Sequence, residues 1–135
     1  MRLLICDDSR TIRVLLRTAL AELGHTDVTE ASDGTIALEL IGQQTFDAVM
    51  LDLHMPQMDG LAVLRELKSK PATAKLPVVI ISSDADMRNV EQARQLGALG
   101  YIRKPFRADG IAKALEAVTT GGRISQRIPP VPKAP

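Results

Sequence analysis

Short apolar runs alternate along this chain with segments in which apolar residues recur at helical spacing. Runs too short for a helix are typical of strands buried on both faces of a parallel sheet. The five runs occupy residues 3–6, 28–31, 46–53, 77–81 and 100–103. Because right-handed crossovers place helices on both faces of such a sheet, we predict a doubly wound, flavodoxin-like (βα)5 fold of the α/β class, with five helices and the strand order 2-1-3-4-5.

Residues that begin and end helices flank the segments between these runs. Ser9 is a good N-cap for the helical spacing that continues to Leu23, and Gly24 is the expected stop. Asp86 is the expected N-cap of the fourth helix, which we expect to stop at Gly97. These signals fit helices between successive strands.

The composition limits the class of protein. The chain has 135 residues, 45% of them hydrophobic, which is enough for one globular domain with its own core. A formal net charge of +1 gives no reason to expect nucleic acid or a membrane surface as a partner. Cys6, the single cysteine, lies in an apolar run and is expected to be a buried small hydrophobe. Without a visible signal peptide or an apolar run near the ~20 residues of a membrane span, we expect a cytoplasmic protein.

The composition changes after the last predicted helix, near residue 121. Four prolines lie within the last seven residues of the chain. Proline cannot continue a helix, and a Pro-rich segment favours an extended backbone. We therefore expect one domain over residues 1–121, followed by a Pro-rich, disordered tail or linker at residues 122–135.

Polar side chains follow the predicted strands at the points where the strands end. They are Asp7 and Asp8 after the first strand, Asp52 near the end of the third, Ser82 and Ser83 after the fourth, and Lys104 after the fifth. The carboxyl ends of parallel strands share one edge of the sheet, where open α/β folds bind ligands. Three carboxylates in one crevice repel one another unless a cation neutralises them, and hard oxygen ligands suit Mg²⁺. We therefore predict a Mg²⁺ site at this edge.

A metal-bound carboxylate beside an ammonium and a hydroxyl group is equipped to receive a phosphoryl group. In this hypothesis Asp52 attacks phosphorus in line, while Mg²⁺ and Lys104 offset charge on the phosphoryl oxygens. A serine hydroxyl donates a hydrogen bond to one of these oxygens. Strand alternation lets only one of Ser82 and Ser83 face the crevice, and the spacing from Pro77 favours Ser82.

Four short sequence motifs at the predicted strand ends resemble those of one protein family. They are Asp7-Asp8, the stretch Leu-Asp-Leu-His-Met-Pro-Gln-Met-Asp-Gly around Asp52, Ser82 after Pro-Val-Val-Ile-Ile, and Tyr-Ile-Arg-Lys-Pro-Phe around Lys104. Together and in this order, they make residues 1 to about 120 resemble the receiver domain of bacterial two-component response regulators. The chain is most similar to the stand-alone, CheY-like chemotaxis type.

The resemblance implies a role in a phosphorelay. Asp52 would be the phosphoacceptor and would take its phosphoryl group from a phosphohistidine on a sensor histidine kinase or a phosphotransfer protein. The side chains of Asp7, Asp8 and Asp52 would hold Mg²⁺ as the cofactor, together with the backbone carbonyl of His54. The family has only self-phosphorylation and slow autodephosphorylation activity, so the resemblance implies that the chain is not an enzyme with an outside substrate.

The resemblance also implies a conformational switch. The hydroxyl of Ser82 would move toward the phosphoryl group, Lys104 would contact that group directly, and Tyr101 would turn inward. The face formed by the last helices and the last strand would then bind a downstream protein target. In this family the Lys104–Pro105 peptide bond is usually cis.

Three alternatives remain open from the sequence. A haloacid-dehalogenase-type phosphatase also pairs an Asp nucleophile with Mg²⁺, but it needs a second Asp two positions later, where this chain has His54. A flavodoxin-like cofactor carrier would need a Gly-rich phosphate loop, and none follows the first predicted strand. The chain could also be the receiver half of a larger regulator whose output domain is missing here.

Several side chains allow a simpler interpretation than a functional one. His54 is expected to overhang the site, where its side chain would tune the access of water to an acyl phosphate. His25 lies in a predicted turn and is expected to be solvent-exposed, and Tyr101 could be a half-buried edge residue without a switching role. Four arginines are expected to be surface charge, with a docking face for an acidic partner as the alternative: Arg88, Arg94, Arg103 and Arg107.

Overall fold

Five parallel strands form the centre of the molecule. The computed structural model describes residues 1–83 and 87–119. Within these residues the strands are β1 (Leu3–Cys6), β2 (Val28–Ala31), β3 (Ala48–Asp52), β4 (Val78–Ser82) and β5 (Gly100–Arg103). Their order in the sheet is β2-β1-β3-β4-β5, and every neighbouring pair is parallel. The predicted strand order is confirmed.

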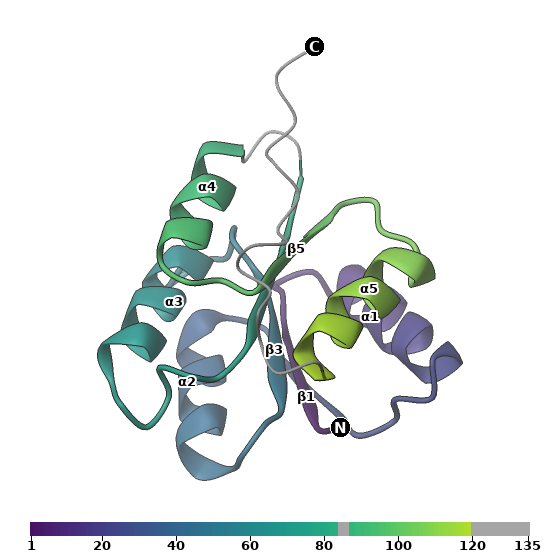
Figure 1. Cartoon of the computed structure of the whole chain (residues 1–135), viewed down its shortest axis with the longest axis horizontal. Helices are drawn as coiled ribbons and strands as arrows, with labels where there is room; N and C mark the ends of the chain where they lie inside the picture. Colours follow the sequence, from purple (N-terminus) through teal and green to yellow (C-terminus); the bar gives the residue numbers. More distant parts are fainter. Residues whose placement is uncertain (84–86, 120–135) are drawn as a thin grey trace.

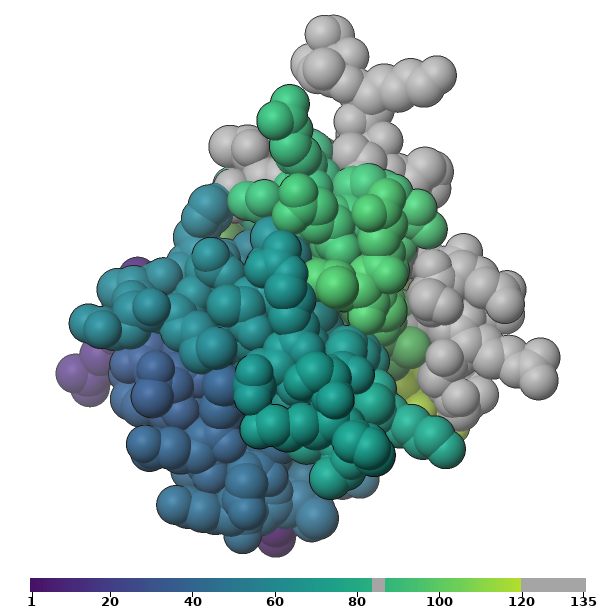
Figure 2. All heavy atoms as spheres, turned by 90° about the vertical axis from the view of Figure 1, so that its left-hand side faces the viewer, coloured from purple at the N-terminus to yellow at the C-terminus, as the bar shows by residue number. Residues whose placement is uncertain are grey.

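Helices cover both faces of this sheet (Figure 1). One face carries α1 (Arg10–Glu22) and α5 (Ala108–Thr119). The other carries α2 (Gly34–Gln43), α3 (Gly60–Ser69) and α4 (Met87–Gln95), which Figure 2 shows from outside in blue, teal and green. The predicted (βα)5 architecture is therefore confirmed over the described part of the chain.

The alternation of side chains along each strand divides the core into two layers. In β3, Val49 and Leu51 pack toward α2, α3 and α4, whereas Ala48 and Met50 pack toward α1 and α5. Every residue of β1, β3 and β4 is buried. This explains why these strands are apolar up to their last residues, Asp52 in β3 and Ser82 in β4, since a strand covered on both faces has no solvent side.

Capping side chains begin the first three helices. Ser9 Oγ accepts the Ile12 N–H at 3.3 Å, as the sequence predicts for the start of α1. Asp33 and Asp59 play the same part at the starts of α2 and α3. The expected stop at Gly24 has φ 89°, the left-handed conformation that glycine adopts readily. The expected cap Asp86 lies outside the described residues, as does the predicted tail at 122–135.

Both boundaries of two strands differ from the predicted ranges 46–53 and 77–81, since β3 is Ala48–Asp52 and β4 is Val78–Ser82. The third strand starts at Ala48 rather than at residue 46, because its register partner in β1 is Leu3, the first residue of that strand. The fourth strand starts at Val78 rather than at Pro77, whose nitrogen cannot donate to the ladder. No helix in the described ranges is both long and apolar enough to cross a membrane.

Candidate functional site

The predicted polar residues lie at the carboxyl edge of the sheet. Asp7 directly follows β1, Asp52 is the last residue of β3, and Ser82 is the last residue of β4. Lys104 directly follows β5, and its backbone N–H donates to the Ser82 carbonyl at 2.8 Å. The Lys104–Pro105 peptide bond is cis. Parallel pairing thus brings to one edge residues that are far apart in sequence.

Asp7 is fully buried and is held at both its backbone and its carboxylate. Its N–H donates to the Ala31 carbonyl on β2 at 3.1 Å. Its Oδ1 accepts the backbone N–H of Ser9 at 2.8 Å. Its other oxygen, Oδ2, is buried and forms an ion pair with Lys104 Nζ at 3.1 Å, but it accepts no hydrogen bond from the residues that the structure describes. One carboxylate oxygen of Asp7 is therefore available for a cation.

Asp52 is buried beside Asp7 and Lys104. Its Oδ1 accepts the His54 N–H at 3.3 Å and lies 3.3 Å from Lys104 Nζ. Burial, and then the nearby charge of Asp7, raise the pKa of Asp52 to about 6, although Lys104 and the His54 amide oppose the shift. A cation bound here would favour the ionised carboxylate, which is the nucleophilic form.

Lys104 is the ammonium group of the cluster. Burial alone would lower its pKa, but the carboxylates of Asp52 and Asp7 outweigh burial and raise it. Lys104 is therefore positively charged at neutral pH. Its charge does not balance the cluster, because Asp7, Asp8 and Asp52 together supply three acidic groups.

The acidic cluster has the composition of a magnesium site. Asp7, Asp8 and Asp52 each offer an oxygen, and these oxygens all lie within 4.8 Å of one another. Asp7 and Asp52 are buried, whereas Asp8 is exposed. Hard carboxylate oxygens with room for water on one side suit Mg²⁺, which keeps several of its waters in proteins. The structural observation that favours a metal cation here is the buried Asp7 Oδ2, which shares the single Lys104 ammonium with Asp52 and has no hydrogen bond from the described residues.

Comparison with known proteins places this geometry in a family. A family model described as the response regulator receiver domain matches residues 3–116. The chain belongs to the response regulator receiver family. It is 35% identical over 118 residues to the chemotaxis protein CheY of Pseudomonas aeruginosa, an alignment that covers 87% of this chain and 95% of that protein.

Solved structures show the same relationship. The receiver domain of NtrX from Brucella abortus matches with a TM-score of 0.79 at 36% identity, covering 87% of this chain and 98% of that one. A response regulator receiver domain protein from Clostridium thermocellum matches with a TM-score of 0.80 at 30% identity, covering 88% and 94%. The predicted family and fold are confirmed. The chain is thus a phosphoacceptor receiver, a signalling module that acts between a histidine kinase and a downstream target.

Two predicted switch residues of the receiver domain face the same side of the sheet. Ile80 is paired in register with Tyr101, and Ser82 lies two residues further along β4, so both Ser82 and Tyr101 point toward α4. Ser82 is fully buried, whereas the neighbouring Ser83 is partly exposed. Tyr101 is half-buried, with its hydroxyl 3.9 Å from the Met87 sulfur.

Cys6 and His54 flank the receiver site. The Cys6 thiol is buried 3.3 Å from the Met55 sulfur, so the predicted buried role is confirmed. Burial, and then the charges of Asp33, Asp52 and Asp7, raise its pKa to about 12. His54 is exposed, and its backbone N–H bonds to Asp52. The metal-binding role predicted for its carbonyl stays a prediction.

The four predicted surface arginines are all exposed, in agreement with the simpler interpretation of them. Arg94 forms an ion pair with Glu91 on its own helix, α4. An exposed pair at this spacing contributes little to stability. The alternative, a docking face for an acidic partner, stays a prediction. The four are Arg88, Arg94, Arg103 and Arg107.

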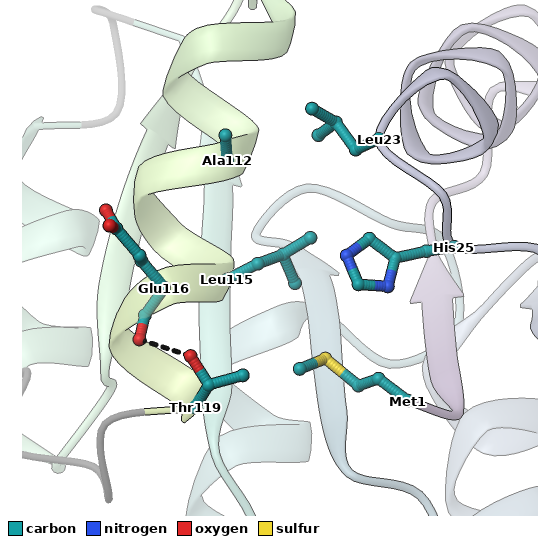
Figure 3. A pocket seen from close by; sticks show the side chains of 7 residues that line it. All are labelled: Met1, Leu23, His25, Ala112, Leu115, Glu116 and Thr119. Atoms are coloured by element: carbon teal, nitrogen blue, oxygen red, sulfur yellow. Dashed lines mark hydrogen bonds between the residues drawn. The ribbon is translucent and has the colours of Figure 1, made fainter.

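His25 differs from its prediction. It is half-buried rather than solvent-exposed, and it lines a pocket of about 240 Å³ at the amino end of the strands. Figure 3 shows its ring pointing toward Leu115 of α5, with Met1 and Leu23 on either side. The reason is tertiary, because the turn after α1 lies against the end of α5. This pocket is at the opposite edge of the sheet from Asp52.

Gly60 also shapes the site, a role that the sequence alone did not predict. This glycine begins α3, and its N–H donates to the Leu53 carbonyl at 3.1 Å. A Cβ at this position would collide with the carbonyl oxygen of Asp52 and lie 2.8 Å from the Leu53 Cα. Only glycine allows α3 to begin this close to the strand end that carries Asp52. The Asp-Gly pair at residues 59–60 was the available signal.

Proposed function

We propose that Asp52 accepts a phosphoryl group from a phosphohistidine on a sensor histidine kinase or phosphotransfer protein. The observation that carries this proposal is the buried Asp52 carboxylate with an ammonium 3.3 Å away and a second buried carboxylate beside it. A buried like-charge pair is costly, and such costs concentrate at functional sites. The cost is offset when a cation and a phosphoryl group complete the site.

Each residue of the site has a separate role in the transfer of the phosphoryl group. An Asp52 oxygen attacks phosphorus in line, the new O–P bond forms, and the P–N bond to histidine breaks with its electron pair returning to the imidazole. Lys104 stabilises negative charge on the phosphoryl oxygens, and the Ser82 hydroxyl donates a hydrogen bond to one of them. Asp7, Asp8, Asp52 and the His54 carbonyl would hold Mg²⁺, which supplies positive charge beside the same oxygens.

Phosphorylation then changes the conformation of the surface that α4 and β5 form. A phosphoryl group adds roughly two negative charges, which draw Lys104 and the Ser82 hydroxyl toward it. Because Tyr101 shares a sheet face with Ser82, movement at the end of β4 reaches this ring, which turns inward. The surface of α4, β5 and α5 is the proposed binding face for a downstream protein, with no nucleic acid or membrane partner.

Hydrolysis of the acyl phosphate takes place at the same site and returns the protein to its unphosphorylated state. Water attacks the phosphorus of the acyl phosphate and regenerates the Asp52 carboxylate with release of phosphate. This is slow autodephosphorylation, and we propose no outside substrate. His54 is exposed next to Asp52, which supports a role for its side chain in tuning the access of water.

We also propose a pathway and a domain boundary. The similarity to the chemotaxis protein CheY of Pseudomonas aeruginosa supports a role in chemotaxis or similar signalling in the cytoplasm. We place the receiver domain at residues 1–121 and the Pro-rich tail at 122–135, in keeping with a family match that ends at residue 116.

The test is phosphorylation by acetyl phosphate, with and without Mg²⁺, measured as intact mass. Wild type should gain one phosphoryl group only with Mg²⁺, and Asp52→Asn should gain none. Asp27→Asn, which changes an exposed carboxylate far from the cluster, serves as the matched control and should behave as wild type. Mg²⁺-dependent gain that persists in Asp52→Asn would place the acceptor elsewhere. Steady release of phosphate from many phosphomonoesters would favour a phosphatase.

A further inference from the structure

Arg13 joins the acidic loop after β1 to the edge strand β2. Its Nη1 donates to the backbone carbonyl of Asp7 at 2.7 Å, and its Nε donates to Glu30 Oε1 at 2.9 Å. The Arg13 side chain is only 15% exposed, and both of its bonds are partly buried. A planar guanidinium with two fixed partners holds both at a defined angle.

The bond to Asp7 controls one particular peptide group. The N–H of Asp7 is held by Ala31, and its Oδ1 is held by Ser9. The carbonyl held by Arg13 belongs to the peptide that joins Asp7 to Asp8. Because the orientation of this peptide sets the direction in which the next side chain leaves the backbone, Arg13 determines where the exposed Asp8 carboxylate points.

We propose that Arg13 is a positioning residue that orients the Asp7–Asp8 peptide so that both carboxylates meet one Mg²⁺. This inference rests on the proposed function, because it requires that the acidic cluster binds Mg²⁺. Arg13 does not touch the metal or the phosphoryl group. It acts through the backbone, as the outer partners of metal ligands commonly do.

A purely electrostatic role for Arg13 predicts the opposite effect. Its positive charge lies next to the acidic cluster and would weaken the binding of a cation. Removal of that charge would then tighten Mg²⁺ binding, whereas loss of the positioning bond would weaken it. The sign of the change therefore separates the two explanations.

Arg17 supplies a matched control. It pairs with the same carboxylate, its Nε donating to Glu30 Oε2 at 2.9 Å, and it also bonds a backbone carbonyl, that of Val28 at 2.9 Å. Neither of these two bonds reaches Asp7. Arg13→Gln and Arg17→Gln each remove one positive charge, one bond to Glu30 and one bond to a carbonyl, but only Arg13→Gln frees the acidic loop.

The experiment measures Mg²⁺ affinity by isothermal titration calorimetry on wild type, Arg13→Gln and Arg17→Gln, together with urea unfolding of each. Arg13→Gln should bind Mg²⁺ about tenfold more weakly, a loss typical of outer-partner substitutions. Arg17→Gln should stay within about twofold of wild type while losing similar stability. Binding by Arg13→Gln that equals or exceeds that of wild type would overturn the proposal, as would equal losses in the two variants.

A measurement on wild type keeps the proposal testable if Arg13→Gln does not fold. Nitrogen-15 NMR of the arginine side chains should show the Arg13 Nε–H resonance shifting on saturation with Mg²⁺ and the Arg17 resonance unchanged. An unshifted Arg13 resonance in protein that binds Mg²⁺ would overturn the inference alone. Wild type that binds no Mg²⁺ at all would instead contradict the metal site of the proposed function.

Discussion

Two charged clusters lie next to each other and differ in how their carboxylates are paired. Arg13 joins them through its bond to the Asp7 carbonyl. At the carboxyl edge of the sheet, Asp7 and Asp52 bring like charges together in a buried place, with Lys104 as the ammonium between them. The pKa of Asp52 is raised to about 6, first by burial and then by Asp7. Two buried carboxylates that share one ammonium therefore leave excess negative charge, which destabilises the fold when no metal cation is bound.

In the neighbouring cluster one carboxylate is paired with two guanidinium groups. Glu30 lies on β2 and accepts 2.9 Å bonds from both Arg13 and Arg17 of α1. Burial opposes ionisation of Glu30, but the two arginines outweigh it and lower its pKa. The Glu30 carboxylate therefore has two cationic partners that favour its ionised form, whereas the buried Asp7 and Asp52 carboxylates share one ammonium.

The largest expected effect comes from the backbone beneath the acidic site. Gly60→Ala should destabilise the receiver domain by about 2–3 kcal/mol, because the added Cβ must displace the Asp52 carbonyl or the start of α3. The displacement should also move Asp52 and slow phosphorylation by acetyl phosphate. Urea unfolding and intact mass measure the two effects.

Gly42 provides the control for this substitution. It lies in α2, and an added Cβ there has no atom within 4 Å. Gly42→Ala should therefore be neutral or stabilising by up to about 1 kcal/mol, as expected for alanine in a helix. Equal losses of stability in the two variants would show that the close approach at Gly60 has no special cost.

The second expected effect tests the strain at Asp52 directly. Its folded-state pKa of about 6 exceeds the ordinary 3.8, so the fold prefers the protonated carboxyl. The destabilisation is therefore absent below about pH 4, develops as pH rises to about 6, and is complete above it. In metal-free buffer at pH 7, Asp52→Asn should be more stable than wild type by on the order of 2 kcal/mol.

The pH dependence and the metal dependence provide the controls for Asp52→Asn. The difference in the free energy of unfolding should vanish near pH 4. Mg²⁺ should narrow it at pH 7, because a ligand that binds only the folded state stabilises that state. Wild type that is more stable than Asp52→Asn in metal-free buffer at pH 7 would show that the acidic site is not strained.

The sequence predicted what depends on local pattern and topology. Apolar runs and helical spacing were sufficient for the strands and their order, and the parallel sheet then brought Asp7, Asp52 and Lys104 to one edge. The Arg13–Glu30 bond could not be predicted in the same way, because many pairings of charged side chains fit one topology. The half-burial of His25 depends on how closely α5 approaches the turn after α1, which no local pattern records.

The smallest expected effect tests the cluster of Glu30 with Arg13 and Arg17. The pKa of Glu30 is lowered from its ordinary 4.5, so its ion pairs stabilise the fold above that pH and lose their contribution as pH falls through the lower folded-state pKa. Glu30→Gln should therefore cost about 1 kcal/mol at pH 7, since the pair is partly exposed, and less in acid. Urea unfolding at both pH values measures the change.

Glu30→Gln and Asp52→Asn each remove one negative charge, yet at pH 7 they should change stability in opposite directions. Both differences should shrink as pH falls, because each wild-type carboxylate then becomes neutral like its amide replacement. If both variants were stabilising, net charge rather than local pairing would govern this region. If the two changes in the free energy of unfolding have opposite signs at pH 7 and both approach zero in acid, the difference between the clusters comes from the groups that surround each carboxylate.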